Sequence, residues 1–184
     1  AKLGHSHAMF NLGVLYRHGR GVKKDEAEAA RLFRLAVDAG YVAALPILGL
    51  LYELGQGVPQ DYDEAVRLYR RATNAGDSSV KLNLGACYEY GRGVKQDLVE
   101  AARLYREAAD GGDTQAMVKI GLLLDAGKGV AQDAVKAFGW YRKAAEAENT
   151  DALKRAGLSR FDGVGSPRDL TAAISYLQKS PSTY

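Results

Sequence analysis

Glycine recurs along the chain at a fixed interval of 36 residues. Four such series are present: Gly13, Gly49, Gly85, Gly121 and Gly157; Gly19, Gly55, Gly91, Gly127 and Gly163; Gly21, Gly57, Gly93, Gly129 and Gly165; and Gly4, Gly40, Gly76 and Gly112. Together they hold 19 of the 21 glycines, so the glycine content reflects a repeated unit and not a loose chain. A fixed period of this length is typical of repeat proteins, in which each unit buries its apolar surface only by stacking on its neighbours.

The period divides the chain into units without any insertion. The five units are 5–40, 41–76, 77–112, 113–148 and 149–184, and we expect them to form one repeat domain over 1–184. Residues 1–4 bring Gly4 into register with Gly40, so we expect them to be the tail of a preceding unit in a longer protein. The last unit departs from the others, because Ser159 and Arg160 replace apolar residues and residues 180–184 replace the usual ending. Polar substitution on one face predicts a terminal cap.

Each unit is predicted to form two helices, which we term helix A and helix B. In the second unit, helix A ends at Gly55 and Gly57, because glycine readily adopts the left-handed conformation that stops a helix. Helix B begins at Asp61, whose carboxylate can accept the free amides of the first turn, and Glu64 completes a pairing akin to a capping box. Gly76 ends helix B. No alternating strand pattern appears, so the predicted class is all-α.

Small residues within the helices predict one close crossing in each unit. Gly49 lies inside helix A and Ala65 lies on the apolar face of helix B, and both positions repeat along the chain. We expect the alanine to be the residue that packs against the glycine.

These residues carry a resemblance to a known family. The segment from Ala44 to Gly76 follows the pattern A-x-x-x-L-G-x-x-Y-x-x-G-x-G-V-x-x-D-x-x-x-A-x-x-x-Y-x-x-A-x-x-x-G. It resembles the Sel1-like repeat, a relative of the tetratricopeptide repeat, and the resemblance extends over essentially all 184 residues. The resemblance implies a right-handed α-solenoid that acts as a non-enzymatic scaffold or adaptor and binds other proteins.

The variable positions of helix A are the candidate binding surface for a partner protein or peptide. In a solenoid of this kind the A helices line the concave side. The predicted surface comprises Phe10, Asn11, Arg17, Glu53, Leu54, Leu82, Asn83, Glu89, Tyr90, Val118, Lys119, Asp125 and Arg155. Its apolar members are alternatively core residues, and the wholly apolar column Val14, Leu50, Ala86, Leu122 and Leu158 is the one we predict to be core.

Polar members of the predicted surface allow two interpretations each. Asn11 and Asn83 either hydrogen-bond a bound peptide backbone or join neighbouring helices, and we favour the second. Lys119, Lys154 and Arg155 make one end of the surface basic, which indicates either an acidic partner segment or a solvated cluster.

No catalytic or metal site emerges from the sequence. The only histidines, His5, His7 and His18, lie in the first unit without a column of carboxylates or cysteines beside them. Cys87 is the single cysteine, which excludes an internal disulfide, and it is most simply a small buried residue. We therefore expect no enzymatic activity, no cofactor and no bound metal.

Rival functions remain open at this stage. A net charge of +3 does not by itself predict a nucleic-acid partner, and no apolar run reaches the roughly 20 residues of a membrane-spanning helix. The rivals are a scaffold for a cell-envelope polysaccharide or another polymer such as a nucleic acid, a hydrolase, and a structural spacer between domains. No targeting signal is present in the segment, so both the cell envelope and the cytoplasm are compatible with the sequence, and the oligomeric state is open.

Overall fold

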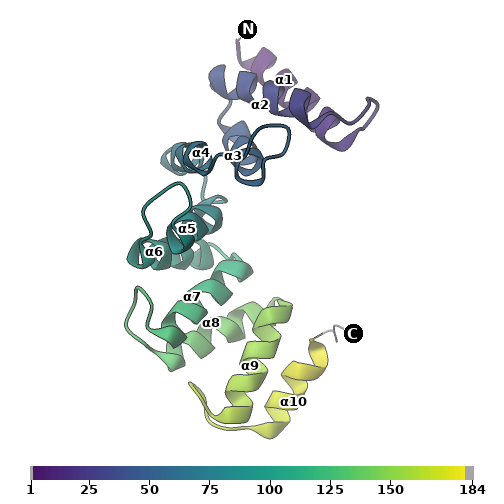
Figure 1. The fold of residues 1–184 in the computed structure, drawn as a ribbon. Coiled ribbons are helices and arrows are strands. Elements are labelled where there is room, and N and C mark those ends of the chain that lie inside the picture. Colours follow the sequence, from purple (N-terminus) through teal and green to yellow (C-terminus); the bar gives the residue numbers. More distant parts are fainter. Residues whose placement is uncertain (1, 181–184) are drawn as a thin grey trace. The chain divides into compact units, whose positions relative to one another are not determined.

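The chain is built from helices alone over the part that the structure describes. The computed structural model describes the backbone of residues 2–180 and the side chains of residues 5–180 (Figure 1). The helices are α1 (Lys2–His18), α2 (Glu26–Asp38), α3 (Leu45–Leu54) preceded by a short 3₁₀ turn (Val42–Ala44), α4 (Tyr62–Asn74), α5 (Lys81–Tyr90), α6 (Leu98–Asp110), α7 (Thr114–Ala126), α8 (Ala134–Glu146), α9 (Thr150–Asp162) and α10 (Leu170–Lys179). Residues 2–180 contain no strand, which confirms the predicted all-α class.

The helices fall into two compact units. One spans Ala1–Gln96 and contains α1 to α5, and the other spans Asp97–Tyr184 and contains α6 to α10. The odd-numbered helices are the predicted A helices and the even-numbered helices are the B helices. Within each unit a B helix packs against the A helix that follows it, as α2 does on α3 and α8 does on α9.

Every A helix ends at a glycine, as predicted. Gly55 caps α3 with a φ of 67°, a value in the left-handed region that other residues adopt at a cost, and its amide donates to the Leu51 carbonyl. The glycines at the same position in the other repeats share this conformation. The residue that ends helix A therefore has the same left-handed conformation in all five described turns.

Aspartate begins each B helix, but the capping box is only half formed. The Asp61 carboxylate accepts the Glu64 amide at 3.0 Å, as predicted. The Glu64 side chain does not return the bond, because it forms two hydrogen bonds to the Arg67 guanidinium, each 2.6 Å long. The Asp61 amide instead donates to the Tyr52 carbonyl at the end of α3. The cap residue thus ties helix B to helix A, and no glutamate is needed to satisfy its amide.

In the first, second and fourth repeats the glycine inside helix A meets an aromatic ring and not the predicted alanine, whereas in the fifth Gly157 meets the Leu177 side chain and the Ala173 carbonyl. A Cβ placed on Gly49 would lie 2.6 Å from Cε1 of Tyr69, and one on Gly13 would lie 2.9 Å from Cε1 of Phe33. Such distances are far below carbon–carbon contact, so the ring rests directly on the glycine backbone. Ala65 is buried, yet it is not the residue against Gly49. In the repeats with a ring the prediction of an alanine partner was wrong, because the edge of the ring fills the space that the missing Cβ leaves.

The second glycine of the turn forms the junction between repeats in every described turn except the first. A Cβ on Gly57 would collide with the carbonyl of Glu26, the first residue of the preceding B helix. The same close approach joins Gly93 to Tyr62, Gly129 to Leu98, and Gly165 to Ala134. Backbone therefore packs on backbone at each of these junctions, which fixes the spacing of neighbouring repeats.

The core runs between the A and B helices and differs in one column from the prediction. Leu48, Leu51, Leu68 and Tyr69 are buried in the second repeat. The column predicted to be core is not buried at any of its five positions, Val14, Leu50, Ala86, Leu122 and Leu158. Apolar character alone does not place them in the core, and in the second repeat the buried residue is one position further along, at Leu51.

Both ends of the described chain depart from expectation. Gly4 lies inside α1, which runs from Lys2 to His18, and the expectation that residues 1–4 belong to a preceding unit stays a prediction. The last repeat is not a polar cap, since α10 exposes the apolar Leu170, Ile174 and Leu177. Of the predicted unusual ending at residues 180–184, residues 181–184 lie outside the described residues.

Candidate binding surface

Two predicted acidic contact residues are engaged within the protein. The Tyr69 hydroxyl donates to Oε2 of Glu53 at 2.6 Å, and the Tyr141 hydroxyl donates to Oδ2 of Asp125 at 2.7 Å. Burial, followed by these hydrogen bonds, raises the pKa of both tyrosines well above its ordinary value. Glu53 and Asp125 therefore hold the ring that rests on the helix A glycine, and they are not merely a charged rim.

A residue of the following repeat also lies close to the buried tyrosine of helix B. Nδ2 of Asn83 lies 3.4 Å from the same Glu53 oxygen. Lys119 Nζ lies 6.0 Å from the centroid of the Tyr105 ring, and the Arg155 guanidinium lies 5.8 Å from that of Tyr141. Asn83, Lys119 and Arg155 occupy equivalent positions, so this column joins adjacent repeats. For Asn83 this supports the interpretation as a residue that links helices, which the sequence already favoured.

The first repeat shows the signal in the sequence that could have identified these contacts. Phe33 replaces the tyrosine and has no hydroxyl, and at the same position as Glu53 the first repeat carries Arg17. The residue equivalent to Asn83 is then the apolar Ile47. All three positions change together, as expected when the hydroxyl that unites them is absent. Arg17 therefore has no tyrosine hydroxyl to bind, unlike Glu53 and Asp125 at the same position.

Two apolar members of the predicted surface belong to the packing. Val118 is only 8% exposed, so it contributes to the core of α7 and offers no surface to a partner. Phe10 is half-buried, and its ring centroid lies 5.6 Å from that of Phe33 and 5.1 Å from that of Tyr41. Leu82 is half-buried on α5. Asn11 is exposed on α1, and Glu89 is half-buried near the end of α5.

Leu54 and Tyr90 are the large apolar members that remain at the surface. Leu54 is 52% exposed at the end of α3, and Tyr90 is 51% exposed at the end of α5. They occupy the same position in adjacent repeats of one compact unit. The Arg92 guanidinium lies 5.0 Å from the centroid of the Tyr90 ring, which places a positive charge beside this apolar surface.

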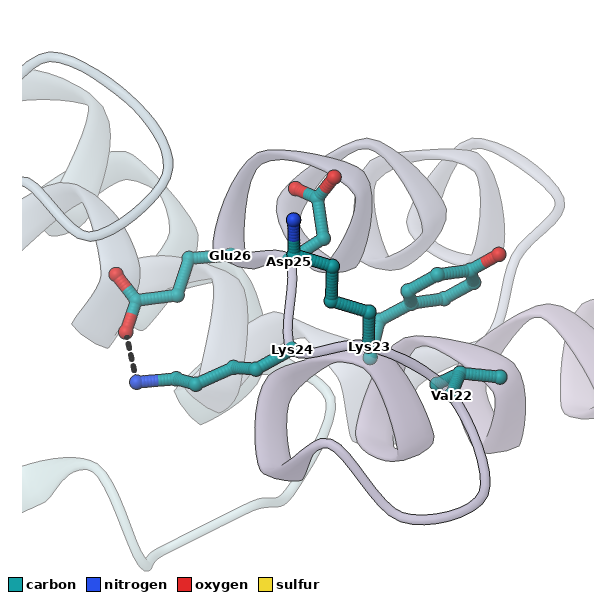
Figure 2. A pocket seen from close by; sticks show the side chains of 6 residues that line it. Val22, Lys23, Lys24, Asp25 and Glu26 are labelled. Carbon is teal, nitrogen blue, oxygen red and sulfur yellow. Dashed lines mark ion pairs between the residues drawn. The ribbon is translucent and has the colours of Figure 1, made fainter.

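An open cleft of about 830 Å³ lies at the turn between α1 and α2. Its lining is Tyr16, Val22, Lys23, Lys24, Asp25 and Glu26. Figure 2 shows the ion pair in which Lys24 Nζ lies 2.7 Å from a Glu26 carboxylate oxygen. The Asp25 carboxylate accepts the Glu28 amide as the cap of α2, so both acidic residues of the cleft have structural partners.

The described residues hold no arrangement suited to metal chemistry. Residues 2–180 contain no group of three or more histidine, cysteine, aspartate or glutamate side chains that could hold a metal ion. Cys87 is buried, and burial raises the pKa of its thiol to about 12. Among these same residues no helix is both long and apolar enough to cross a membrane.

Comparison with known proteins matches the repeats directly. The model of the Sel1 repeat matches residues 6–41, 47–77, 80–113, 114–149 and 150–180. A search of curated proteins gave no match. Among solved structures, the chain is similar to c5321, a protective antigen of uropathogenic Escherichia coli with an SLR fold, at 37% identity and a TM-score of 0.91. That match covers 96% of this chain and 38% of the antigen, so the chain spans well under half of that relative.

Two further structures agree with this assignment. A Sel1 repeat protein from Oxalobacter formigenes is 32% identical with a TM-score of 0.87, over 95% of this chain and 71% of that protein. Cysteine-rich protein B of Helicobacter pylori is 24% identical with a TM-score of 0.53, over 67% of this chain and 93% of that protein, and it supports the fold alone. With all five repeats matched and the same all-α solenoid fold in its relatives, the chain belongs to the Sel1 repeat family.

Proposed function

We propose that this protein is a scaffold that binds a segment of a partner protein on the A-helix surface of the unit Ala1–Gln96, centred on Leu54 and Tyr90. Sel1 repeat proteins generally mediate protein–protein interactions, and the family is generally non-catalytic. The observation that carries the site is the exposure of two large apolar side chains at the same position of adjacent repeats.

Contacts within the protein reduce the number of residues that remain available to a partner. Glu53 and Asn83 are engaged with Tyr69, so replacing them would disturb the fold as well as any binding. Leu54 contributes little to the core because half of its surface faces solvent. Aromatic residues and exposed apolar side chains near arginine are typical of the centres of protein interfaces.

Charge indicates the kind of segment that would bind. Arg17 on α1 and Arg92 beside the Tyr90 ring bring positive charge to the A-helix side of this unit, whereas the Glu53 carboxylate is engaged by the Tyr69 hydroxyl. The occupant that fits is a partner segment with an apolar anchor for Leu54 and Tyr90 and an acidic residue for Arg92. Exposed charge pairs mainly direct the approach and the specificity, and the buried apolar contact supplies most of the affinity.

The test is a crosslinking pull-down from the source cell with three baits. The baits are the wild type, the double variant Leu54→Asp/Tyr90→Asp, and the control variant Val135→Asp, whose side chain is exposed on α8. We expect the wild type and the control to recover the same proteins and the double variant to lose them. Circular dichroism melts establish that all three baits are folded, and a recovered protein is then purified and its affinity for each bait measured directly.

One outcome contradicts the proposal. If the folded double variant recovers the same proteins at the same yield as the control, Leu54 and Tyr90 are not the binding surface.

A further inference from the structure

Arg92 lies beside the rings of two tyrosines. Its guanidinium carbon is 5.0 Å from the centroid of the Tyr90 ring and 5.6 Å from the centroid of the Tyr62 ring. Tyr62 is the first residue of α4, and the close approach of Gly93 to its carbonyl brings the turn after α5 against it. All of these residues belong to the unit Ala1–Gln96. The two rings attract the cation, but they do not neutralise its charge.

No carboxylate of the described chain neutralises Arg92 either. Over residues 5–180 the side-chain contacts of Arg92 are the two tyrosine rings, and no acidic side chain forms an ion pair with it. Arg31 by contrast forms an ion pair with Glu28 at 2.7 Å. Arg92 is also exposed, so its N–H donors are accessible to an acceptor from outside the protein.

The Tyr62 hydroxyl supplies a second donor beside Arg92. Nε2 of Gln60 donates to this hydroxyl at 2.9 Å and to the Glu53 carbonyl at 2.8 Å. A tyrosine oxygen that accepts a hydrogen bond from an amide keeps its own hydrogen for donation. Gln60 therefore orients the hydroxyl and leaves its proton available to a ligand.

Packing between repeats does not depend on this cluster. At the other junctions the pairs of residues in the positions of Tyr62 and Arg92 are Glu26 and Gln56, Leu98 and Lys128, and Ala134 and Val164. These junctions form the same contact between a glycine and a main-chain carbonyl without two rings and an arginine. The cluster is therefore a feature of one junction and not of the repeat.

The charges around the cluster favour a ligand with a single negative charge. Arg92 and Lys95 are exposed in the turn after α5, and Asp61 and Asp63 flank Tyr62 in the sequence. The two positive and two negative charges balance, so a monoanion meets less repulsion than a phosphate ester, which carries nearly two negative charges at neutral pH. The planar fork of a guanidinium also matches the two oxygens of a carboxylate.

We propose that Arg92 and Tyr62 together bind one carboxylate of the partner segment, from an aspartate or glutamate side chain, beside the apolar side chain that packs on Tyr90 and Leu54. This inference rests on the proposed function and extends it in two ways. It adds Tyr62 to the surface as a specificity-determining residue, and it excludes a phosphorylated side chain as the group at Arg92. Because Arg92 lies only 5.0 Å from the Tyr90 ring centroid, the acidic and apolar side chains lie on the same face of the segment.

The experiment titrates the protein with phenylpropionate, a small molecule with one phenyl ring and one carboxylate. Two-dimensional NMR follows the side-chain N–H of Arg92 during the titration. A ligand of this size is expected to bind with a dissociation constant of roughly 1–10 mM. Neutral phenylpropionamide and phenethyl phosphate keep the phenyl ring, and each is expected to bind at least about fivefold more weakly.

Three variants assign the donors. Tyr62→Phe keeps the ring but removes the hydroxyl, and it should bind phenylpropionate at least about threefold more weakly. Arg92→Lys keeps the charge but loses the planar fork, and it should bind at least about fivefold more weakly. Lys95→Gln is the matched control, because it removes an exposed positive charge from the same turn, and its affinity should stay within about twofold of the wild type. Circular dichroism establishes that each variant is folded.

Four outcomes would overturn the proposal. They are a wild type without a shift at about 50 mM phenylpropionate, equal binding of phenethyl phosphate, an unchanged affinity of Tyr62→Phe, and a loss in Lys95→Gln as large as in Arg92→Lys. The titration needs no partner protein, so its result is independent of the pull-down. A pull-down in which Leu54→Asp/Tyr90→Asp keeps its partners would instead remove the proposed function.

Discussion

Replacing Gly49 by alanine tests the contact between the helix A glycine and the Tyr69 ring of helix B. The new Cβ would lie 2.6 Å from Cε1 and 2.8 Å from Cδ1 of Tyr69, whereas carbon atoms in contact lie about 3.5–4.0 Å apart. The ring would therefore have to retreat by about 1 Å. It is buried and its hydroxyl is bound to Glu53 at 2.6 Å, so it cannot retreat without straining that hydrogen bond.

The expected cost follows from three contributions. Overpacking costs about 1–3 kcal/mol, and a weakened hydrogen bond to a charged group adds about 1.5–3 kcal/mol when it is lost completely. Alanine in place of glycine inside a helix stabilises the folded state by about 0.5–1 kcal/mol, which offsets part of this cost. We expect Gly49→Ala to lower the free energy of unfolding by about 2–4 kcal/mol.

Two matched variants isolate the cause. Gly139→Ala makes the same change inside α8, where no other atom lies within 4 Å of the new Cβ, and it should stabilise by about 0.5–1 kcal/mol. Gly13→Ala brings the Cβ to 2.9 Å from the Phe33 ring, which has no hydroxyl to hold it, so its cost should lie between the two. Urea unfolding followed by circular dichroism gives the midpoints. A Gly49→Ala protein at least as stable as the wild type would refute the reasoning, because it would mean that the ring is free to move.

Three other measurements address the junctions, the tyrosines and the cysteine. Gly57→Ala and Gly21→Ala impose alanine at nearly the same φ, 71° and 73°, but only Gly57 approaches a neighbouring carbonyl. Gly57→Ala should therefore lower the free energy of unfolding by at least about 2 kcal/mol more than Gly21→Ala does. Equal urea midpoints for the two variants would contradict the junction contact. The pKa of Tyr69 is raised in the folded state, so the contribution of its hydroxyl to stability is complete below pH 10, where free tyrosine ionises, and declines as the pH rises further. Tyr69→Phe should be less stable than the wild type at pH 7 by about 1–2 kcal/mol. The difference in urea midpoint between the two proteins should narrow between pH 9 and pH 11. Burial raises the pKa of the Cys87 thiol to about 12, so a disulfide reagent at pH 8 should label the native protein at least about 100-fold more slowly than the urea-unfolded chain, and equal rates would show that the thiol is accessible.

The sequence predicts the local structure well because each local signal has a local cause. Gly55 stops a helix through its own conformation, and Asp61 starts one through a bond to an amide three residues away. Neither requires knowledge of how the helices pack.

The candidate surface was harder to predict because the environment of a side chain depends on residues far along the chain. From the sequence alone Glu53 is interpreted as a surface charge. Only the fold shows that it accepts a hydrogen bond from Tyr69, 16 residues later. Val118 lies in the same column as the half-buried Leu82, yet it is buried, and apolar character alone does not separate the two. Only the joint change at Arg17, Phe33 and Ile47 encodes the contact, and a single column examined by itself does not reveal it.

The backbone contact at Gly57 and its equivalents has a consequence for how such a chain can change in length. Each of these junctions involves only two adjoining repeats, and it is made by a glycine and a main-chain carbonyl whose geometry does not depend on the identity of the carbonyl residue, which is Glu26, Tyr62, Leu98 or Ala134 in turn. Duplicating or deleting 36 residues in register would therefore recreate a compatible junction at the new boundary. Gene rearrangements could lengthen or shorten the protein one repeat at a time, while Leu54, Tyr90 and other surface positions diverge independently of the junctions.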